Sequence, residues 1–321
     1  MTTWLASSNV AAARALLVLT ENWTLRPRPT LHDLVELAVA AEAVGVNGVM
    51  VSDHVVLGPT SNELGEPLNL RDYAMPGNQD PATWWPSPYV LLSAIAARTT
   101  TLRLVIGAII SPLRHPLVTA KDLGTLDLLS DGRLVVLPTV SWHRDEYAAL
   151  AVDFSTRGAI LDEQLDVWRR VWTTSPASFH GRFYDFHDVW VEPKAFRSGG
   201  PTLWFGGSTV HDAVARRLAN YGSGFNPLGR PTSDELARLD AALTNVNRSR
   251  DEIEMVGGIR GSFATAQQVA SLDDALEGVR EQLDLGYSTI CFKPSMFTDE
   301  LSDVPDVCRR VVEFLASAKG A

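Results

Sequence analysis

Hydrophobic and polar positions along the chain define two kinds of segment that alternate. Short runs rich in Val, Ile and Leu predict strands buried on both faces, and the longer stretches between them have the spacing of amphipathic helices. The expected strands are 15–20, 48–52, 102–110, 133–137, 202–205, 222–226, 254–258 and 288–292. The expected helices are 31–44, 88–97, 116–129, 156–173, 210–219, 233–246, 272–285 and 304–317.

Regular alternation of strands and helices predicts an α/β fold, a (β/α)₈ TIM barrel, in preference to an open doubly wound sheet. Helix-capping signals agree with the boundaries, because Thr30 precedes Asp33 by three residues and Ser271 precedes Asp274 in the same way. No composition break divides the chain, so we expect residues 1–321 to form a single domain. Two long interruptions, 55–87 and 174–201, are expected as lids or binding loops at the carboxyl-terminal rim.

Composition limits the function classes. The 321 residues are 45% hydrophobic and 21% charged with a net charge of −10, which argues against nucleic acid or an anionic membrane as a partner. Cys291 and Cys308 are expected to be buried, reduced thiols, as in a cytoplasmic protein. The apolar stretch 11–19 is interrupted by Arg14 and too short to span a bilayer, so neither a signal peptide nor a transmembrane helix is expected. Base rates favour a homodimer.

In a barrel, the residues that follow the strands form one rim, where the chemistry of this fold is found. These residues are polar here: Glu21, Asn22, Asp53, His54, Ser111, Arg114, His115, 139–143, 206–209, Asn226, 260–262 and Lys293. Asp53 and His54 give the best single indication of an enzyme, because an imidazole suits proton transfer near neutral pH. The alternative is a structural histidine that is hydrogen-bonded within its loop.

Other motifs carry less information. The Gly206-Gly207-Ser208 turn before a helix is a candidate phosphate cradle, and the alternative, which the turn alone favours, is a tight strand-to-helix connection. No His-x-His or His-Glu-x-x-His pattern occurs, and His180 and His187 lie in a surface-like segment, so no metal is expected. No nucleophile elbow, P-loop or strand-linked Gly-x-Gly-x-x-Gly is present. Trp84, Trp85 and Trp142 are the tryptophans we expect near a flat aromatic ligand.

The order of several motifs resembles the luciferase-like flavin and deazaflavin oxidoreductases, in particular the branch of probable coenzyme F420-dependent oxidoreductases. The resemblance rests on segments 43–57, 112–116, 121–127, 129–134, 178–184 and 204–208, and it fades after Asn226. It implies a TIM barrel that holds a flavin-like ring at the carboxyl ends of the strands.

The same resemblance assigns residues to the site. It makes Asp53 and His54 the pair at the ring, with His54 as the proton donor or acceptor. Gly107 and Ala108 correspond to a non-proline cis peptide behind the ring, and Gly206, Gly207 and Ser208 correspond to a loop that binds the cofactor's phosphate or ribityl end. Relatives carry Gly-x-Gly-x-Gly-Trp after the fourth strand, whereas this chain has 137–142 as Leu-Pro-Thr-Val-Ser-Trp. Thr139, Ser141 and Trp142 are therefore the expected contacts there.

The leading hypothesis is an oxidoreductase that transfers a hydride between coenzyme F420 and a small organic substrate. An FMN-dependent monooxygenase of the same superfamily is the first alternative, and a cofactor-free relative without catalysis is the second, because the glycines are replaced. A Schiff-base lyase that uses Lys293 would need a desolvated lysine. The Lys293-Pro294 sequence is more typical of a surface or anion-contacting turn.

Overall fold

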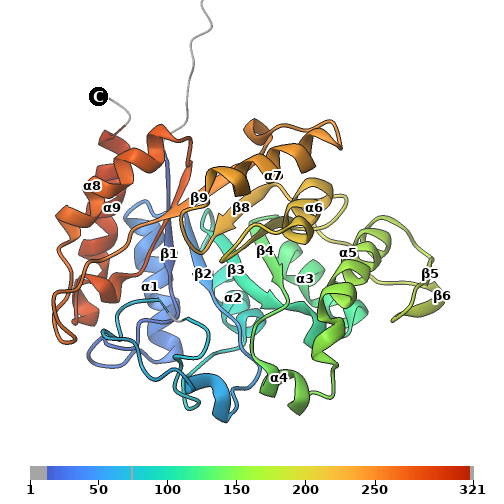
Figure 1. Ribbon diagram of the computed structural model, residues 1–321, viewed down its shortest axis with the longest axis horizontal. Helices are drawn as coiled ribbons and strands as arrows, with labels where there is room; N and C mark the ends of the chain where they lie inside the picture. The colour runs from blue at the N-terminus through green and yellow to red at the C-terminus, as the bar shows by residue number, and fades with distance from the viewer. Residues whose placement is uncertain (1–12, 74, 319–321) are drawn as a thin grey trace, which may run out of the picture.

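Eight parallel strands close into a barrel, and helices cover its outer surface (Figure 1). The computed structural model describes residues 13–73 and 75–318, so the start of the apolar stretch 11–19 lies outside the described residues. Around the barrel the strand order is β1-β10-β9-β8-β7-β4-β3-β2. The strands are β1 Arg14–Val18, β2 Gly48–Val51, β3 Arg103–Ile110, β4 Leu134–Thr139, β7 Thr202–Gly207, β8 Gly224–Pro227, β9 Glu254–Gly258 and β10 Thr289–Phe292. The (β/α)₈ fold expected from the sequence is confirmed.

Most helices also lie where the pattern predicts them. They are α1 Leu31–Ala43, α2 Pro88–Ala96, α3 Pro116–Leu129, α4 Arg144–Ala149, α5 Arg157–Thr173, α6 Asp212–Tyr221, α7 Ser233–Thr244, α8 Leu272–Asp284 and α9 Val304–Ser317. Thr30 and Asp33 form the expected capping box at the start of α1, and the Ser271 side chain caps α8. Within the described part of the chain, no helix is long and apolar enough to cross a membrane.

Two features were not expected. The short helix α4 follows β4, and the interruption 174–201 contains an antiparallel hairpin of β5 Ala177–His180 and β6 Asp185–Val189. This hairpin projects at the right-hand edge of Figure 1. The interruption connects the end of α5 to the start of β7. Its ends therefore lie at the amino-terminal face of the barrel, and of the two long interruptions only 55–87 belongs to the carboxyl-terminal rim.

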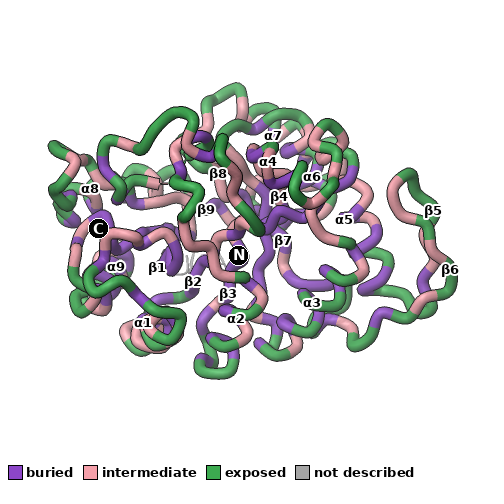
Figure 2. The backbone as a smooth tube through the Cα atoms, turned by 90° about the horizontal axis from the view of Figure 1, so that it is seen from below, coloured by how far each residue is buried: buried purple, intermediate pink, exposed green. Residues whose placement is uncertain are grey.

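Alternating side chains along each strand fill two layers of core. In β3, Leu104 and Ile106 join the outer core beneath the helices, whereas Val105 belongs to the cluster inside the barrel. Trp204 of β7 and Cys291 of β10 also lie in the inner cluster. The buried strands form the centre of the molecule in Figure 2. Because side chains fill the interior, a ligand has room only at an end of the barrel.

Both cysteines are free and buried, as the sequence predicts. Cys291 points into the barrel and Cys308 packs in the outer core from α9. Burial raises the pKa of each thiol to about 12, because the thiolate would lose its hydration. Neither thiol is therefore a reactive nucleophile at neutral pH.

Candidate active site at the carboxyl-terminal rim

The buried side chain of Asp53 connects the ends of β2 and β3. Its carboxylate accepts a hydrogen bond from the Ile110 backbone N–H at 3.0 Å, and it pairs with both terminal nitrogens of Arg114 at 2.8 and 2.9 Å. The Asp53 side chain is 1% exposed. Since protein groups already occupy both oxygens, this geometry favours a positioning role for Asp53 over direct catalysis.

His54 is held by a carboxylate that sequence reasoning missed. Glu146 of α4 is fully buried, and its Oε2 lies 3.2 Å from His54 Nδ1. Its Oε1 accepts the backbone N–H groups of Val55 at 2.6 Å and Val56 at 3.3 Å. Because Nδ1 faces Glu146, Nε2 is the ring nitrogen that remains for another partner. This acid–imidazole pair is the arrangement that orients a general acid or base.

Two tryptophans enclose the His54 ring. Trp85, from the loop after β2, lies with its ring centroid 5.1 Å away, and Trp142 lies 6.2 Å away on the side of β4. The His54 side chain is 9% exposed. The structure therefore brings His54, Trp85 and Trp142 together, whereas Trp84, the third tryptophan expected near a ligand, lies against Arg28 and lines a separate small hollow.

The segment around α4 anchors the beginning of the rim loop. His143 Nε2 accepts the Gly58 backbone N–H at 2.7 Å, and the Asp145 carboxylate accepts the N–H and hydroxyl of Thr60, each at 2.9 Å. Desolvation lowers the pKa of His143, which suits an imidazole that must stay neutral to accept this bond. Together with Glu146, these groups hold residues 54–60 over the barrel.

The expected cis peptide is present between Gly107 and Ala108. The pairing of β3 with β4 shifts register there, between Gly107 and Ile109. A side chain on Gly107 would approach the Met50 sulfur to 2.8 Å, so the close contact favours glycine. On the neighbouring strand end, Ser141 has a φ of 58°. This left-handed conformation favours glycine, so the backbone keeps a glycine-like shape at Ser141 although the sequence has lost the residue.

The Gly206-Gly207-Ser208 turn differs from the expected cradle in one respect. A methyl group on Gly206 would overlap the Asn226 carbonyl oxygen, and Gly207 has a φ of 150°. Helix α6 begins only at Asp212, and the Val210 N–H before it donates to the Glu235 carboxylate at 2.7 Å. With two carboxylates at this helix start, the turn is not a helix-terminal anion site. Its own backbone groups stay the predicted contacts.

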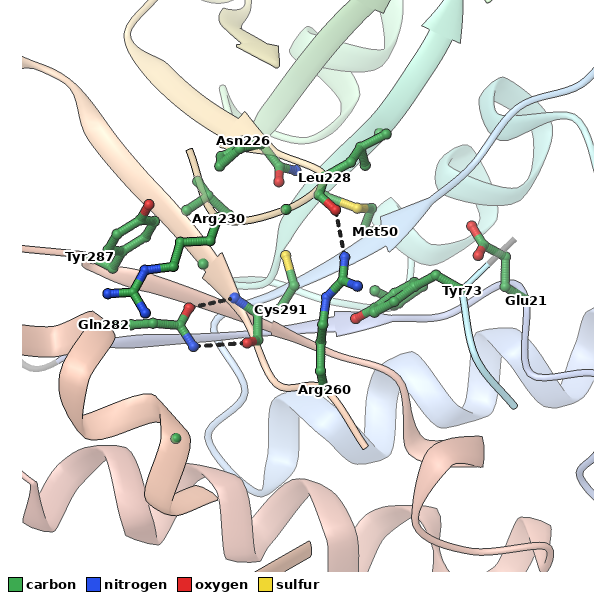
Figure 3. Close-up of a pocket in the computed structure, with 18 of the residues that line it drawn as sticks. Glu21, Met50, Tyr73, Asn226, Leu228, Arg230, Arg260, Gln282, Tyr287 and Cys291 are labelled. Atoms are coloured by element: carbon green, nitrogen blue, oxygen red, sulfur yellow. Dashed lines mark hydrogen bonds between the residues drawn. The ribbon is translucent and has the colours of Figure 1, made fainter. Parts of the chain in front are cut away.

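A cavity of about 310 Å³ opens beside these residues at the mouth of the barrel (Figure 3). Its walls are mainly apolar, and its polar side chains at the barrel mouth include Glu21, Ser52, Tyr73 and Arg260. The cavity also reaches α8, where the paired side chains of Arg230 and Glu281 line it together with Gln282. Ser52 donates to the Glu21 carboxylate at 2.5 Å. The Arg260 guanidinium lies 5.6 Å from the Tyr73 ring, and it forms no ion pair with any carboxylate of the described residues.

The cavity reaches only some of the predicted contacts. Gly107 lines it directly, and Asn226, the partner of Gly206 across β7 and β8, lines its far side. Asp53, His54, Ala108, Thr139, Ser141, Trp142 and the turn 206–208 lie outside its lining, at the ends of β2, β3, β4 and β7. These four strands are consecutive around the barrel, so the predicted residues form one arc of the rim. The cavity overlaps this arc at β2 and β3 through Met50, Ser52 and Gly107, and otherwise lies against the remaining strands.

The expectation that Lys293 lies in a surface turn is wrong. Its side chain is completely buried, donates to the Asp72 carbonyl at 2.7 Å, and lies over the faces of Trp23 and Tyr73. Desolvation lowers its pKa to about 8. Lys293 thereby holds the rim loop at Asp72 and keeps Tyr73 over the barrel mouth, and it is not among the residues that line the cavity.

A parallel barrel whose rim carries an oriented imidazole, a cis peptide and an adjoining cavity defines an enzyme-like TIM barrel. The chain belongs to the luciferase-like monooxygenase family, whose model matches residues 14–282. The resemblance inferred from the sequence is confirmed.

Relatives within the family include redox enzymes with two kinds of cofactor. An uncharacterized protein of Mycobacterium tuberculosis is 31% identical over 264 residues, covering 80% of this chain and 83% of that protein. An F420-dependent glucose-6-phosphate dehydrogenase of Intrasporangium calvum is 27% identical over 252 residues, covering 72% and 66%. An FMNH(2)-dependent dimethylsulfone monooxygenase of Pseudomonas putida is 32% identical over 130 residues, covering 40% and 35%.

A solved structure with low sequence identity shares the fold over nearly the whole chain. The crystal structure of the monooxygenase RslO1 from Streptomyces bottropensis matches with a TM-score of 0.69 at 19% identity, covering 95% of this chain and 99% of that one. Family members are thus oxidoreductases or monooxygenases, which supports an enzyme here. Their cofactors are F420 or FMN.

Proposed function

We propose that this protein is an oxidoreductase that transfers a hydride between coenzyme F420 and a small organic substrate. The observation that carries the proposal is the cavity at the barrel mouth, which Gly107 at the end of β3 lines. The F420-dependent relative supports the choice of cofactor. When bound, F420 supplies a two-electron hydride carrier that does not require oxygen.

The rim residues fit a flat ring with a polar tail. Gly107 and Ala108 would pass behind the ring, and Thr139, Ser141 and Trp142 would contact it from the end of β4. The glycine-like backbone at Ser141 supports this fit, because the chain can follow the path that glycines allow in relatives. Gly206, Gly207 and Ser208 would contact the tail through backbone groups and the Ser208 hydroxyl.

His54 would move the proton that accompanies the hydride. Glu146 fixes the ring through Nδ1 and leaves Nε2 as the exchanging nitrogen. Asp53 would hold the end of β2 against β3 and so position His54. The apolar cavity walls suit an organic substrate, and Arg260 offers one cation to a polar or anionic group.

The direct test is to titrate the purified protein with F420 and with FMN and then to measure turnover under nitrogen. We expect saturable F420 binding, much weaker FMN binding, and turnover without oxygen consumption. Tight FMN binding with strictly oxygen-dependent turnover would establish the monooxygenase alternative, which the Pseudomonas putida relative supports. Binding of neither cofactor would support a relative without catalysis.

Substitution of His54 tests the proton-transfer role. His54→Ala should lower kcat by about 100-fold or more while the F420 affinity changes little, because general acid–base groups contribute on that order. Glu146→Gln, a change at a positioning residue, should lower kcat less and shift its pH profile. His32→Ala, at an exposed histidine on α1, is the matched control. Normal turnover by His54→Ala would show that His54 is structural.

A further inference from the structure

The β5–β6 hairpin lies away from the barrel mouth (Figure 1). On its exposed surface it brings together three side chains of the types that ligate metals, His180, Asp185 and His187. His180 and Asp185 form a cross-strand pair, and His187 lies two residues beyond Asp185 on the same strand. Side chains in a cross-strand pair, and at positions two apart, point to the same face of a hairpin. The sequence spacing conceals this arrangement, because a turn separates His180 from its partners.

Distances within the cluster suit a small divalent ion. His180 Nδ1 lies 3.1 Å from one Asp185 oxygen, and His187 Nε2 lies 3.5 Å from the other. One ligand atom from each of the three residues falls within 4.8 Å of the others. A tetrahedral zinc ion with bonds of about 2.1 Å holds its ligand atoms about 3.4 Å apart. Only small side-chain movements are therefore needed to bind such an ion.

The hairpin is supported so that these side chains keep their positions. Glu163 of α5 accepts the backbone N–H groups of Arg182, Phe183 and Tyr184 at 2.7 to 2.9 Å, which fixes the turn. On the opposite face, Phe179 and Phe186 stack with ring centroids 6.0 Å apart and pack against the outer core. Ligands on a fixed frame bind with a smaller entropy cost than ligands that must first be ordered.

We propose that His180, Asp185 and His187 form a site for one divalent transition-metal ion of the zinc class. Two imidazoles and one carboxylate are a donor set that suits Zn²⁺, Ni²⁺ or Cu²⁺. The three side chains are 60 to 67% exposed, so the ion can enter, and its remaining coordination positions face solvent. The site is independent of the proposed redox function. It differs from the expectation, from sequence motifs alone, that no metal is bound.

Calorimetric titration of the untagged protein with ZnCl₂ at pH 7.5 tests the proposal. We expect one ion per chain, and His180→Ala and His187→Ala should each weaken the affinity at least tenfold, because even outer contacts of a metal site change affinity by about 10- to 100-fold. Asp185→Asn, which preserves side-chain shape, should also weaken it. His32→Ala, another exposed histidine, should leave it unchanged.

A second measurement separates metal binding from simple ion pairing between Asp185 and protonated imidazoles. Cu²⁺ bound at the site should show nitrogen hyperfine couplings from two imidazoles, which an ion pair alone cannot give. Circular dichroism confirms that each variant is folded. Absence of a saturable Zn²⁺ site, or equal affinity in His180→Ala, His187→Ala and the parent, would overturn the proposal.

Discussion

Replacing Asp53 should destabilise the fold, because its carboxylate pairs a buried charge. The Asp53 side chain is 1% exposed and the Arg114 side chain is 21% exposed. Removing one partner of a buried ion pair costs about 3–5 kcal/mol, since the other charge stays buried without compensation. Partial exposure lets Arg114 recover some hydration and reduces this cost. We expect Asp53→Ala to lower the free energy of unfolding by about 3 kcal/mol, including the unpaired Ile110 N–H.

A double-mutant cycle identifies the source of this loss. Asp53→Asn keeps an acceptor for the Ile110 N–H and should cost less than Asp53→Ala. Arg114→Ala in the Asp53→Ala background should cost less than in the parent, with a coupling energy of about 1–3 kcal/mol. Urea unfolding at pH 7 measures each value, and the slope with denaturant should be unchanged.

The same variants test whether Asp53 only positions the end of β2 or takes part in catalysis. If Asp53 positions the end of β2, turnover and stability should be lost together. Asp53→Ala should then lose more than Asp53→Asn both in urea unfolding and in the turnover assay. A fully stable Asp53→Asn without turnover would refute this reasoning and place Asp53 in the chemistry. Additive effects of Asp53→Ala and Arg114→Ala would show that the ion pair carries none of the stability.

Two further predictions concern stability alone. The folded pKa of Lys293 lies near 8 and the unfolded value near 10.4, so the unfolded chain binds more protons between these pH values, and stability rises with pH there. The advantage of Lys293→Met over the parent should therefore fall by about 3 kcal/mol between pH 7.5 and 10.5, whereas parallel stability curves would show that Lys293 binds protons equally in both states and would exclude the lowered pKa. Gly206→Ala should destabilise markedly, because the new methyl group overlaps the Asn226 carbonyl. Gly278→Ala in α8, where the space is open, should stabilise by about 0.5–1 kcal/mol, and thermal unfolding compares the two.

The strands of the barrel could be predicted because each is buried on both faces. Segment 254–258 matches β9 fully, and 288–292 includes the whole of β10. Helix α4 was missed because its six residues are too few to show a helical period. The β5–β6 hairpin was missed because its exposed face carries polar side chains, so it lacks the continuous apolar run of the barrel strands.

The site could be predicted only in part, because its contacts join residues that are far apart in the sequence. Glu146 lies 92 positions from His54, and no local spacing relates the two residues. The only available signal was an acidic pair, Asp145 and Glu146, just after the rim segment 139–143. Lys293 was misjudged for a similar reason: its burial depends on Trp23 and Tyr73, which come from distant loops.

The adjacent residues Asp53 and His54 show how one strand end can provide both support and chemistry. Along β2, Val49 and Val51 pack in the outer core, while Met50 and the following Ser52 line the cavity. Asp53 continues the outward set and meets Arg114 behind the strand. His54 is the next residue of the inward set, and Glu146 holds its ring between two tryptophans. Because successive side chains of an extended segment alternate, an inserted residue before Asp53 would turn its carboxylate away from Arg114 and the His54 imidazole away from Glu146.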